Sequence, residues 1–239
     1  MQNDNLIISQ QIQENIGRLQ ERIAIACQRA HRSPNEITVV AVTKTVPVNK
    51  IEIALNAGIK NIGENRVQEA LAKFPIIGNK ATWHLVGHLQ TNKVKKALDI
   101  FSMIQSVDSL HLSQEIDKRA SATAKTVPIL IEVNTSQEAT KFGVAPEELF
   151  PFVEQILSLS HLKLMGLMTI GPGLAIQDKE KSRPCFHLLY ELKQKLEAKF
   201  GLKLPYLSMG MTADFEVAIE EGANMLRIGT AIFGARPKN

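Results

Sequence analysis

The feature that most constrains the fold is a repeated alternation of short β-branched runs with amphipathic, helical stretches. A helical stretch follows each of the first seven runs. Strands that alternate with helices pair in parallel, because a parallel connection requires a crossover. Eight such units predict a closed (β/α)8 barrel of the TIM type. The strand-like runs lie at residues 37–44, 60–63, 82–87, 100–106, 126–134, 162–171, 203–210 and 225–234.

The stretch before the first run predicts an additional N-terminal helix over residues 5–32, since its apolar residues recur at spacings of three and four. Gly58 and Gly222 are placed to end helices, Pro146 to open one, and Thr212 to cap the helix after the seventh run. We expect one α/β domain over residues 1–239. A doubly wound open sheet is the alternative, which the absence of a Gly-rich dinucleotide fingerprint after any strand disfavours.

Composition excludes several classes of protein. The chain is 44% hydrophobic and 22% charged, as in ordinary globular proteins. A net charge of +4 is too weak for a nucleic-acid footprint, and Lys93, Lys95 and Lys96 are expected on one solvated helix face. No apolar run approaches the ~18 residues of a membrane span, and no secretory signal is visible. Cys27 and Cys185 match no metal or disulfide spacing. We therefore expect a cytoplasmic protein.

In a barrel of this type the active site lies at the C-terminal ends of the strands. Lys44 ends the first run, where an apolar setting favours the neutral amine and its attack on an aldehyde. The alternative is a lysine that extends out of the barrel mouth into solvent. The side chains expected at this end form a polar ring: Lys44, Asn65, His84, Ser106, Asn134, Thr169, Ser208 and Arg227.

The last two runs carry candidate phosphate ligands. The backbone N–H groups of Gly229 and Thr230, with the hydroxyls of Ser208 and Thr230, are suited to bind a phosphate, and loops after the last two barrel strands often do so. Arg227 stands two residues before this loop and can pair with the phosphate, contact another ligand atom or form an ion pair at the barrel end. Opposite an inward lysine, this pattern favours a phosphorylated aldehyde as ligand.

Other candidate residues have equally good structural explanations. His84 is either a hydrogen-bonded structural residue or a group near the ligand. Asn65 either caps its helix or contacts the ligand. Met168 and Met209 flank the mouth, where methionine usually fills gaps in a core. Lys141 follows the fifth run and is either an exposed loop lysine or a second amine that accepts a cofactor leaving the site.

Six motifs in order resemble the family of pyridoxal phosphate homeostasis proteins, which is related in fold to the N-terminal barrel of alanine racemase. The resemblance covers residues 10–236, with a departure at His88, where many members carry proline. The motifs are AVTKTVP (41–47), IGENRVQEA (62–70), WHLVGHLQTNK (83–93), GLMTIGP (166–172), LSMGMTADFEVAIEEGA (207–223) and RIGTAIFGAR (227–236).

The resemblance implies that Lys44 holds pyridoxal 5′-phosphate (PLP) as a Schiff base and that Arg227 faces the pyridine nitrogen. It also implies phosphate contacts from Ser208, Gly229 and Thr230. Asn65, His84 and Met209 fall in motifs close to the cofactor.

A PLP-dependent enzyme of this fold needs acid–base groups that this sequence does not obviously supply, and their absence favours a carrier. A racemase of this fold takes a second base, a tyrosine, from an additional domain, whereas here the chain stops five residues after the eighth run. Neither Tyr190 nor Tyr206 is placed to replace it, and an arginine keeps the pyridine nitrogen protonated less well than a carboxylate. We expect a non-catalytic PLP carrier in vitamin B6 and amino-acid homeostasis.

Two alternatives stay open, a PLP-dependent racemase, decarboxylase or lyase with weak activity, and a Schiff-base aldolase acting on a phosphorylated sugar. The expected partners are PLP and apo-enzymes that receive it, and the expected state is a monomer or weak dimer.

Overall fold

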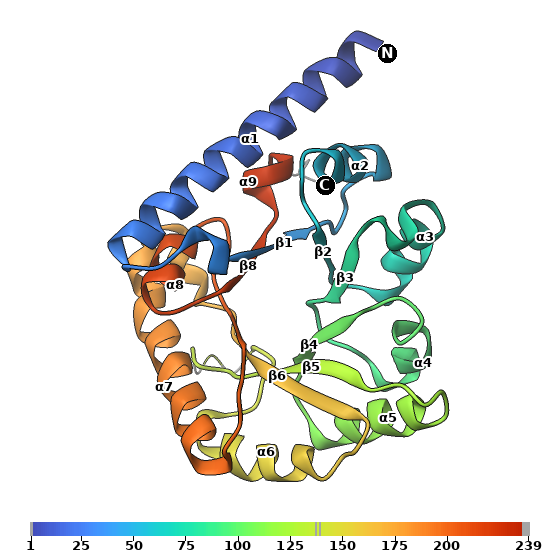
Figure 1. The fold of residues 1–239 in the computed structure, drawn as a ribbon, viewed down its shortest axis with the longest axis vertical. Helices are drawn as coiled ribbons and strands as arrows, with labels where there is room; N and C mark the ends of the chain where they lie inside the picture. The colour runs from blue at the N-terminus through green and yellow to red at the C-terminus, as the bar shows by residue number, and fades with distance from the viewer. Residues whose placement is uncertain (1, 137, 139, 236–239) are drawn as a thin grey trace.

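A closed barrel of parallel strands forms the centre of the molecule, as the alternation predicts (Figure 1). The computed structural model describes residues 2–136, 138 and 140–235 of the 239-residue chain, and within them eight strands pair in chain order, with β8 closing the ring against β1. The strands are β1 (Thr38–Val42), β2 (Asn61–Glu64), β3 (Thr82–Leu85), β4 (Met103–Val107), β5 (Val127–Glu132), β6 (Leu162–Met168), β7 (Tyr206–Ser208) and β8 (Met225–Ile228).

Helices surround the barrel, and one follows each strand of the described chain (Figure 1). A 3-10 turn over Pro146–Glu148 opens the helix after β5, where the sequence places a helix start. The helices are α1 (Gln2–Arg29), α2 (Val48–Asn56), α3 (Val67–Ile77), α4 (Val94–Ala97), α5 (Leu110–Ser121), α6 (Leu149–Leu157), α7 (Arg183–Phe200), α8 (Phe215–Glu220) and α9 (Thr230–Phe233).

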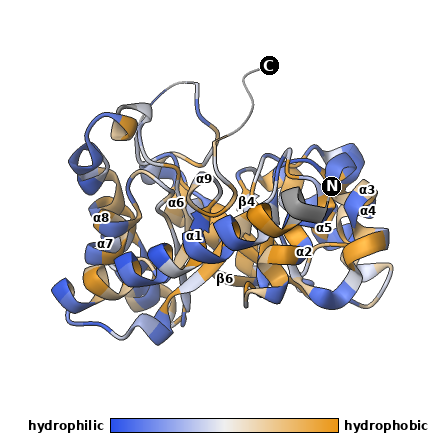
Figure 2. Cartoon of the chain, turned by 90° about the horizontal axis from the view of Figure 1, so that it is seen from above, coloured by the Kyte–Doolittle hydropathy of each residue, from blue (hydrophilic) through white to orange (hydrophobic). Residues whose placement is uncertain are grey.

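The N-terminal helix α1 crosses the outside of the barrel and contacts α2, α8 and α9. Hydrophobic and hydrophilic segments alternate along it (Figure 2). Its inner residues, such as Ile16 and Ile23, are buried, and the Asn15 amide donates to the Ile232 carbonyl of α9. Just beyond α1, the Arg32 guanidinium donates to carbonyls at the end of α8. The helix therefore joins the first and last parts of the chain.

Two apolar cores result from the two faces of the strands. In β1, Ala41 packs in the large core between strands and helices, whereas Val40 packs in a small core inside the barrel. Met168 and Met225 contribute to the inner core. The alternation follows from the period of two along a strand, which points successive side chains to opposite faces.

The β5–β6 pair has a register shift at a glycine. Pairing moves from Leu164 to Gly166 where β5 advances by one residue. A Cβ atom at Gly166 would lie 1.8 Å from the Tyr206 carbonyl oxygen of β7, so the close approach of these backbones requires glycine.

Several local predictions about helix ends need correction. The helix expected to carry Lys93, Lys95 and Lys96 is a 3-10 turn followed by the four-residue α4. Thr212 does not cap α8: its Oγ1 accepts from the Ala231 N–H and so joins two loops. Asn65 does not cap α3, which begins after Arg66 without a side-chain cap bond. Tertiary contacts between loops override the local pattern in these places.

The helix stops expected at Gly58 and Gly222 are confirmed, since each adopts a positive φ just after its helix. Cys27 and Cys185 are buried free thiols. Among the described residues, no helix is both long and apolar enough to cross a membrane.

Candidate functional site

Lys44 lies two residues beyond the end of β1, at the end of the barrel that we call the mouth, where the C-terminal ends of the strands meet. It is half-buried, and it continues the parity of Val40 and Val42, which pack inside the barrel. In the register of β1 with β8, Ala41 stands opposite Ile228. Lys44 therefore follows its strand beside the segment that begins at Gly229.

That neighbouring segment offers backbone donors. Among the loop and turn bonds between backbone groups of the described residues, none has the N–H of Gly229 or Thr230 as its donor. Thr230 is exposed and begins α9, while the next N–H, that of Ala231, donates to Thr212. Backbone N–H groups at such a strand-to-helix turn suit an anion. The structure places Lys44 after β1, and Gly229 and Thr230 after β8, the strand that neighbours β1 in the ring.

A chain of hydrogen bonds crosses the inside of the barrel from β8 to β2. Arg227 Nη1 donates to Ser208 Oγ at 2.7 Å, and Ser208 Oγ donates to Gln105 Oε1 at 2.7 Å. Gln105 Nε2 lies 3.1 Å from His84 Nδ1, and His84 Nε2 lies 3.2 Å from Asn61 Oδ1. The Ser208 hydroxyl is therefore bound within the interior. The chain of bonds links β8 to β7, β4, β3 and β2.

The direction of every bond in this chain follows from chemistry. The Gln105 amide nitrogen only donates, so His84 Nδ1 accepts and His84 Nε2 carries the proton that it donates to Asn61. Burial lowers the pKa of His84 to about 4, which keeps the imidazole neutral at neutral pH and fits this tautomer. His84 is thus a hydrogen-bonded structural residue within reach of Arg227 through two side chains.

Arg227 is buried, and its other contact is a 2.6 Å bond from Nη2 to the Thr169 carbonyl oxygen. Burial lowers its pKa to about 10, so the guanidinium stays charged at neutral pH. The Glu132 carboxylate, only 5% exposed, attracts it electrostatically. Burial raises the pKa of Glu132 to about 7 against this attraction. The interior therefore holds a permanent cation beside an acid that titrates near neutrality.

Three members of the predicted polar ring serve local structure or line a cavity. The Ser106 hydroxyl donates to the Gly87 carbonyl at 2.6 Å. The Asn134 amide donates to the Glu138 carbonyl at 3.0 Å and so holds the loop after β5. Asn65 is half-buried and lines a cavity of about 630 Å³ with Gly87 and Phe142.

Met209 and Met168 lie on opposite sides of the strand layer. Met168 is part of the inner core, whereas Met209 belongs to the core between strands and helices. The side chain of Met209 is fully buried there. This position agrees with the gap-filling role of methionine that the sequence also suggests.

The loop after β5 borders two cavities near the mouth. Phe142 of this loop stacks on His88, with ring centroids 4.2 Å apart, and lines the 630 Å³ cavity. It also lines a cavity of about 130 Å³ that includes Glu132 and Lys141. The Lys141 ammonium is bound to Glu138 and to the Gly171 carbonyl, which ties the β5 loop to the segment after β6.

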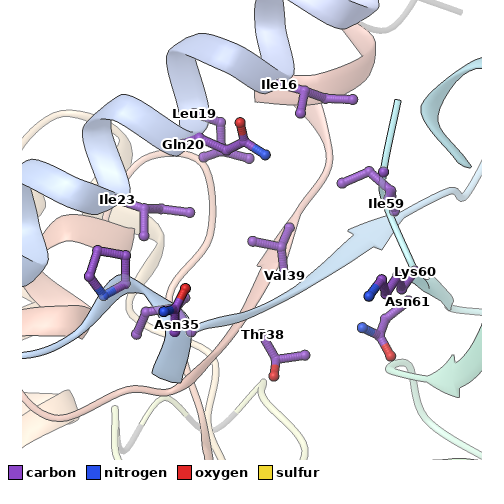
Figure 3. A pocket seen from close by; sticks show the side chains of 13 residues that line it. Ile16, Leu19, Gln20, Ile23, Asn35, Thr38, Val39, Ile59, Lys60 and Asn61 are labelled. Carbon is purple, nitrogen blue, oxygen red and sulfur yellow. The ribbon is translucent and has the colours of Figure 1, made fainter. Parts of the chain in front are cut away.

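A further cavity lies at the opposite end of the barrel (Figure 3). It has a volume of about 470 Å³, and α1 covers it through Ile16, Leu19 and Ile23. The N-terminal ends of β1 and β2 form its other side, including Val39 and Lys60. Because β1 begins at this end, the cavity is separate from the Lys44 mouth.

Gln105 and Glu132 are interior residues that the polar ring omits. Both could be found from strand parity, since Gln105 follows Met103 and Glu132 follows Leu130 at a spacing of two, and both preceding residues belong to the inner core. The predicted ring contains only residues expected at the C-terminal ends of the strands. Gln105 and Glu132 are absent from it because they lie slightly deeper inside the barrel.

Comparisons with known proteins agree with this geometry. The family model described as the alanine racemase N-terminal domain matches residues 10–237. The pyridoxal phosphate homeostasis protein of Aquifex aeolicus is 46% identical over 224 residues, which cover 93% of this chain and 97% of that protein.

Solved structures give the same result. The structure of PipY from Synechococcus elongatus with PLP bound superposes with a TM-score of 0.82 at 32% identity, covering 94% of this chain and 100% of that one. An alanine racemase of Clostridium difficile shares the fold alone, with a TM-score of 0.77 at 15% identity, over 96% of this chain and 58% of that one. The chain therefore belongs to the pyridoxal phosphate homeostasis protein family, within the wider family of the alanine racemase N-terminal domain.

Proposed function

We propose that the protein binds PLP at the mouth of its barrel as a Schiff base on Lys44. The observation that carries the proposal is that Lys44 follows β1, while the N–H groups of Gly229 and Thr230 follow β8, the adjacent strand of the ring. When PLP binds, the Lys44 amine would form a C–N double bond with the aldehyde carbon, and the carbonyl oxygen would leave as water with the two amine hydrogens. The relatives' name and the PLP-bound PipY structure support the choice of aldehyde.

The residues of the mouth fit the rest of this ligand. Gly229 and Thr230 supply donors for the phosphate, and Ser208 contributes through its bond to Arg227. Arg227 supplies a buried positive charge toward the pyridine ring. Asn65, His84 and Met209 support the site from its wall and from behind the strands. When bound, PLP supplies an electrophilic carbon and an electron sink.

We propose further that the protein carries PLP and does not use it as a catalyst. Tyr206 begins β7 and packs at the inner core, two residues before Ser208, and Tyr190 lies half exposed on α7 beside Gly222. Both positions leave the mouth without a tyrosine among the described residues. The permanent charge of Arg227 also weakens the electron sink relative to a carboxylate partner.

Absorbance spectroscopy of the purified protein tests the proposal. Addition of PLP should produce an imine absorption band, and borohydride should reduce the imine to an irreversible adduct. Lys44→Ala should form neither the band nor the adduct. Retention of the band in Lys44→Ala would refute Lys44 as the attachment site. Turnover of amino acids far above the rate of free PLP would refute the carrier role.

A second candidate, a weak PLP-dependent racemase or lyase, is favoured by one observation, the buried Glu132 with a pKa of about 7. Such a group exchanges protons readily at neutral pH. This candidate predicts that some amino acid in a full panel is racemised or cleaved by the PLP-loaded protein. A negative panel would exclude it.

The wider role follows from the same proposal. Residues 1–239 act as one PLP-binding unit in the cytoplasm, as a monomer or weak dimer, and pass PLP to apo-enzymes. This role limits free reactive aldehyde and so contributes to vitamin B6 and amino-acid homeostasis.

A further inference from the structure

A buried cluster of charges lies behind the strand that carries Lys44. Lys73 of α3 donates from Nζ to Glu64 Oε1 at 2.7 Å and to Glu69 Oε1 at 2.8 Å. Glu64 is fully buried at the end of β2, and the Lys73 side chain is 9% exposed. The cluster therefore holds two carboxylates around one ammonium in the layer between strands and helices.

Such a cluster is a poor device for stability alone. Taking charges out of water is costly, and a buried ion pair often contributes no more than apolar residues of similar volume. Here Glu64 Oε2 is also buried without a hydrogen-bond partner. Burial raises the pKa of Glu64 against its bonds to Lys73 and Thr43. An unpaired buried oxygen of this kind needs an explanation other than packing.

The remaining contacts of the cluster go to the backbone on both sides of Lys44. Lys73 Nζ also donates to the Thr43 carbonyl at 2.7 Å, and the Thr43 hydroxyl donates to Glu64 Oε1 at 2.7 Å. On the other side of Lys44, the Thr45 N–H donates to Glu69 Oε1. The residues before and after the lysine are thus both held by the cluster.

The turn needs such support because Thr45 has a φ of 62°. A β-branched residue in the left-handed region is a genuine outlier, and such strain persists only where surrounding contacts fix it. The bond from Thr45 to Glu69 is one of these contacts. The two contacts at Thr43 fix the other end of the same turn.

We propose that Glu64, Glu69 and Lys73 are positioning residues for Lys44, which hold its strained turn in the conformation that presents the amine to the aldehyde. The inference rests on the proposed function for the role of Lys44, and on the described contacts for the fixing of the turn. The cluster lies outside the barrel interior and acts on Lys44 through the backbone of Thr43 and Thr45.

Two measurements on Glu69→Ala test the proposal. In the protein without PLP, exchange of the Thr45 amide hydrogen should be about tenfold faster, because the N–H loses a charged acceptor. Schiff-base formation after addition of PLP should slow by about tenfold, since alignment of the reacting groups is lost. Glu69→Gln keeps an acceptor oxygen and should restore most of the rate.

The matched control is Glu115→Ala. Glu115 pairs with Arg119 at the same i,i+4 spacing on α5, far from Lys44 along the barrel. It should change neither the Thr45 exchange nor the rate. Thr43→Val removes the hydroxyl, which donates to Glu64 and, at 3.3 Å, to the Gly63 carbonyl. It serves as a second variant if Glu69→Ala fails to fold, and it should also slow the reaction.

The outcomes separate this proposal from the previous one. Unchanged Thr45 exchange, or faster exchange with an unchanged rate of Schiff-base formation, would overturn the positioning role. If the unmodified protein forms no Schiff base, or Lys44→Ala still forms one, the proposed function fails instead. The exchange measurement without PLP then still decides whether the cluster fixes the turn.

Discussion

At the scale of single residues, the inside of the barrel holds a buried polar chain next to its small apolar core, where a TIM-type barrel is usually filled with branched apolar side chains. Arg227, Ser208, Gln105 and His84 are all buried, and each has a partner of the right kind. A buried polar group without a hydrogen-bond partner is destabilising, so removal of one side chain of this chain would leave its neighbour unpaired and destabilise the fold. The protein therefore depends on the whole chain to keep Arg227 in place.

Acid should weaken this arrangement through His84. The unfolded state takes up a proton near pH 6.5, whereas the folded state does so only near pH 4. The contribution of His84 to stability is therefore fully present above pH 6.5 and is lost as the pH falls toward 4, by about 3 kcal/mol. Glu132, with its pKa raised to about 7, acts in the opposite direction over this range, so the loss is measured as the difference between the unmodified protein and His84→Gln. Urea unfolding at both pH values measures this loss, and His84→Gln should lack it.

The exposed His111 of α5 provides the control for this prediction. His111→Gln should show the same decrease in unfolding free energy on acidification as the unmodified protein. An equal decrease in His84→Gln would show that the imidazole is not the group responsible.

At the scale of elements, strand pairing depends on close backbone approach at one point. Gly166→Ala places a Cβ atom against the Tyr206 carbonyl, and neither β6 nor β7 can move without disturbing the ring. The substitution should lower the free energy of unfolding by more than about 3 kcal/mol. Chemical denaturation measures the change.

Gly17→Ala is the matched control for this substitution. Gly17 lies within α1 with open space around its Cα, so alanine should raise stability by about 0.5–1 kcal/mol. A mild effect at Gly166, similar in size to that at Gly17, would contradict the close approach of β6 and β7.

The elements also show which features follow from sequence. The strands and their order were predictable because β-branched runs, helical spacing and the crossover rule all agree. The starts of helices were harder to predict. Thr212 has a side chain suited to cap a helix, but its hydroxyl accepts a hydrogen bond from the Ala231 N–H, which follows β8. The cluster around Lys73 was not predictable, because lysine on a helix normally faces solvent and only the packing of α3 on β2 buries it.

The candidate site follows the same division. Lys44, Gly229 and Thr230 are predicted from strand ends and motifs, and the strands that they follow, β1 and β8, are neighbours in the ring. Gln105 and Glu132 required knowledge of which strand residues face inward. Contacts that cross the barrel depend on register, which a single sequence does not specify.

At the scale of the whole molecule, ligand binding should be visible as stability. A ligand that binds only the folded state stabilises it by about 2.7 kcal/mol at 100 times its Kd. PLP at that concentration should therefore raise the melting temperature of the unmodified protein. Lys44→Ala should lose most of the increase, and a full increase in this variant would argue against attachment at Lys44.

The closure of the ring between β1 and β8 has a kinetic consequence. The two strands pair although nearly the whole chain lies between them, and such distant contacts form slowly. Lys44 follows the first strand, and Gly229 and Thr230 follow the last. If these residues hold the aldehyde and its phosphate as proposed, a growing chain on the ribosome has no complete binding site until the final strand has emerged, so that ligand capture has to wait for the completion of folding.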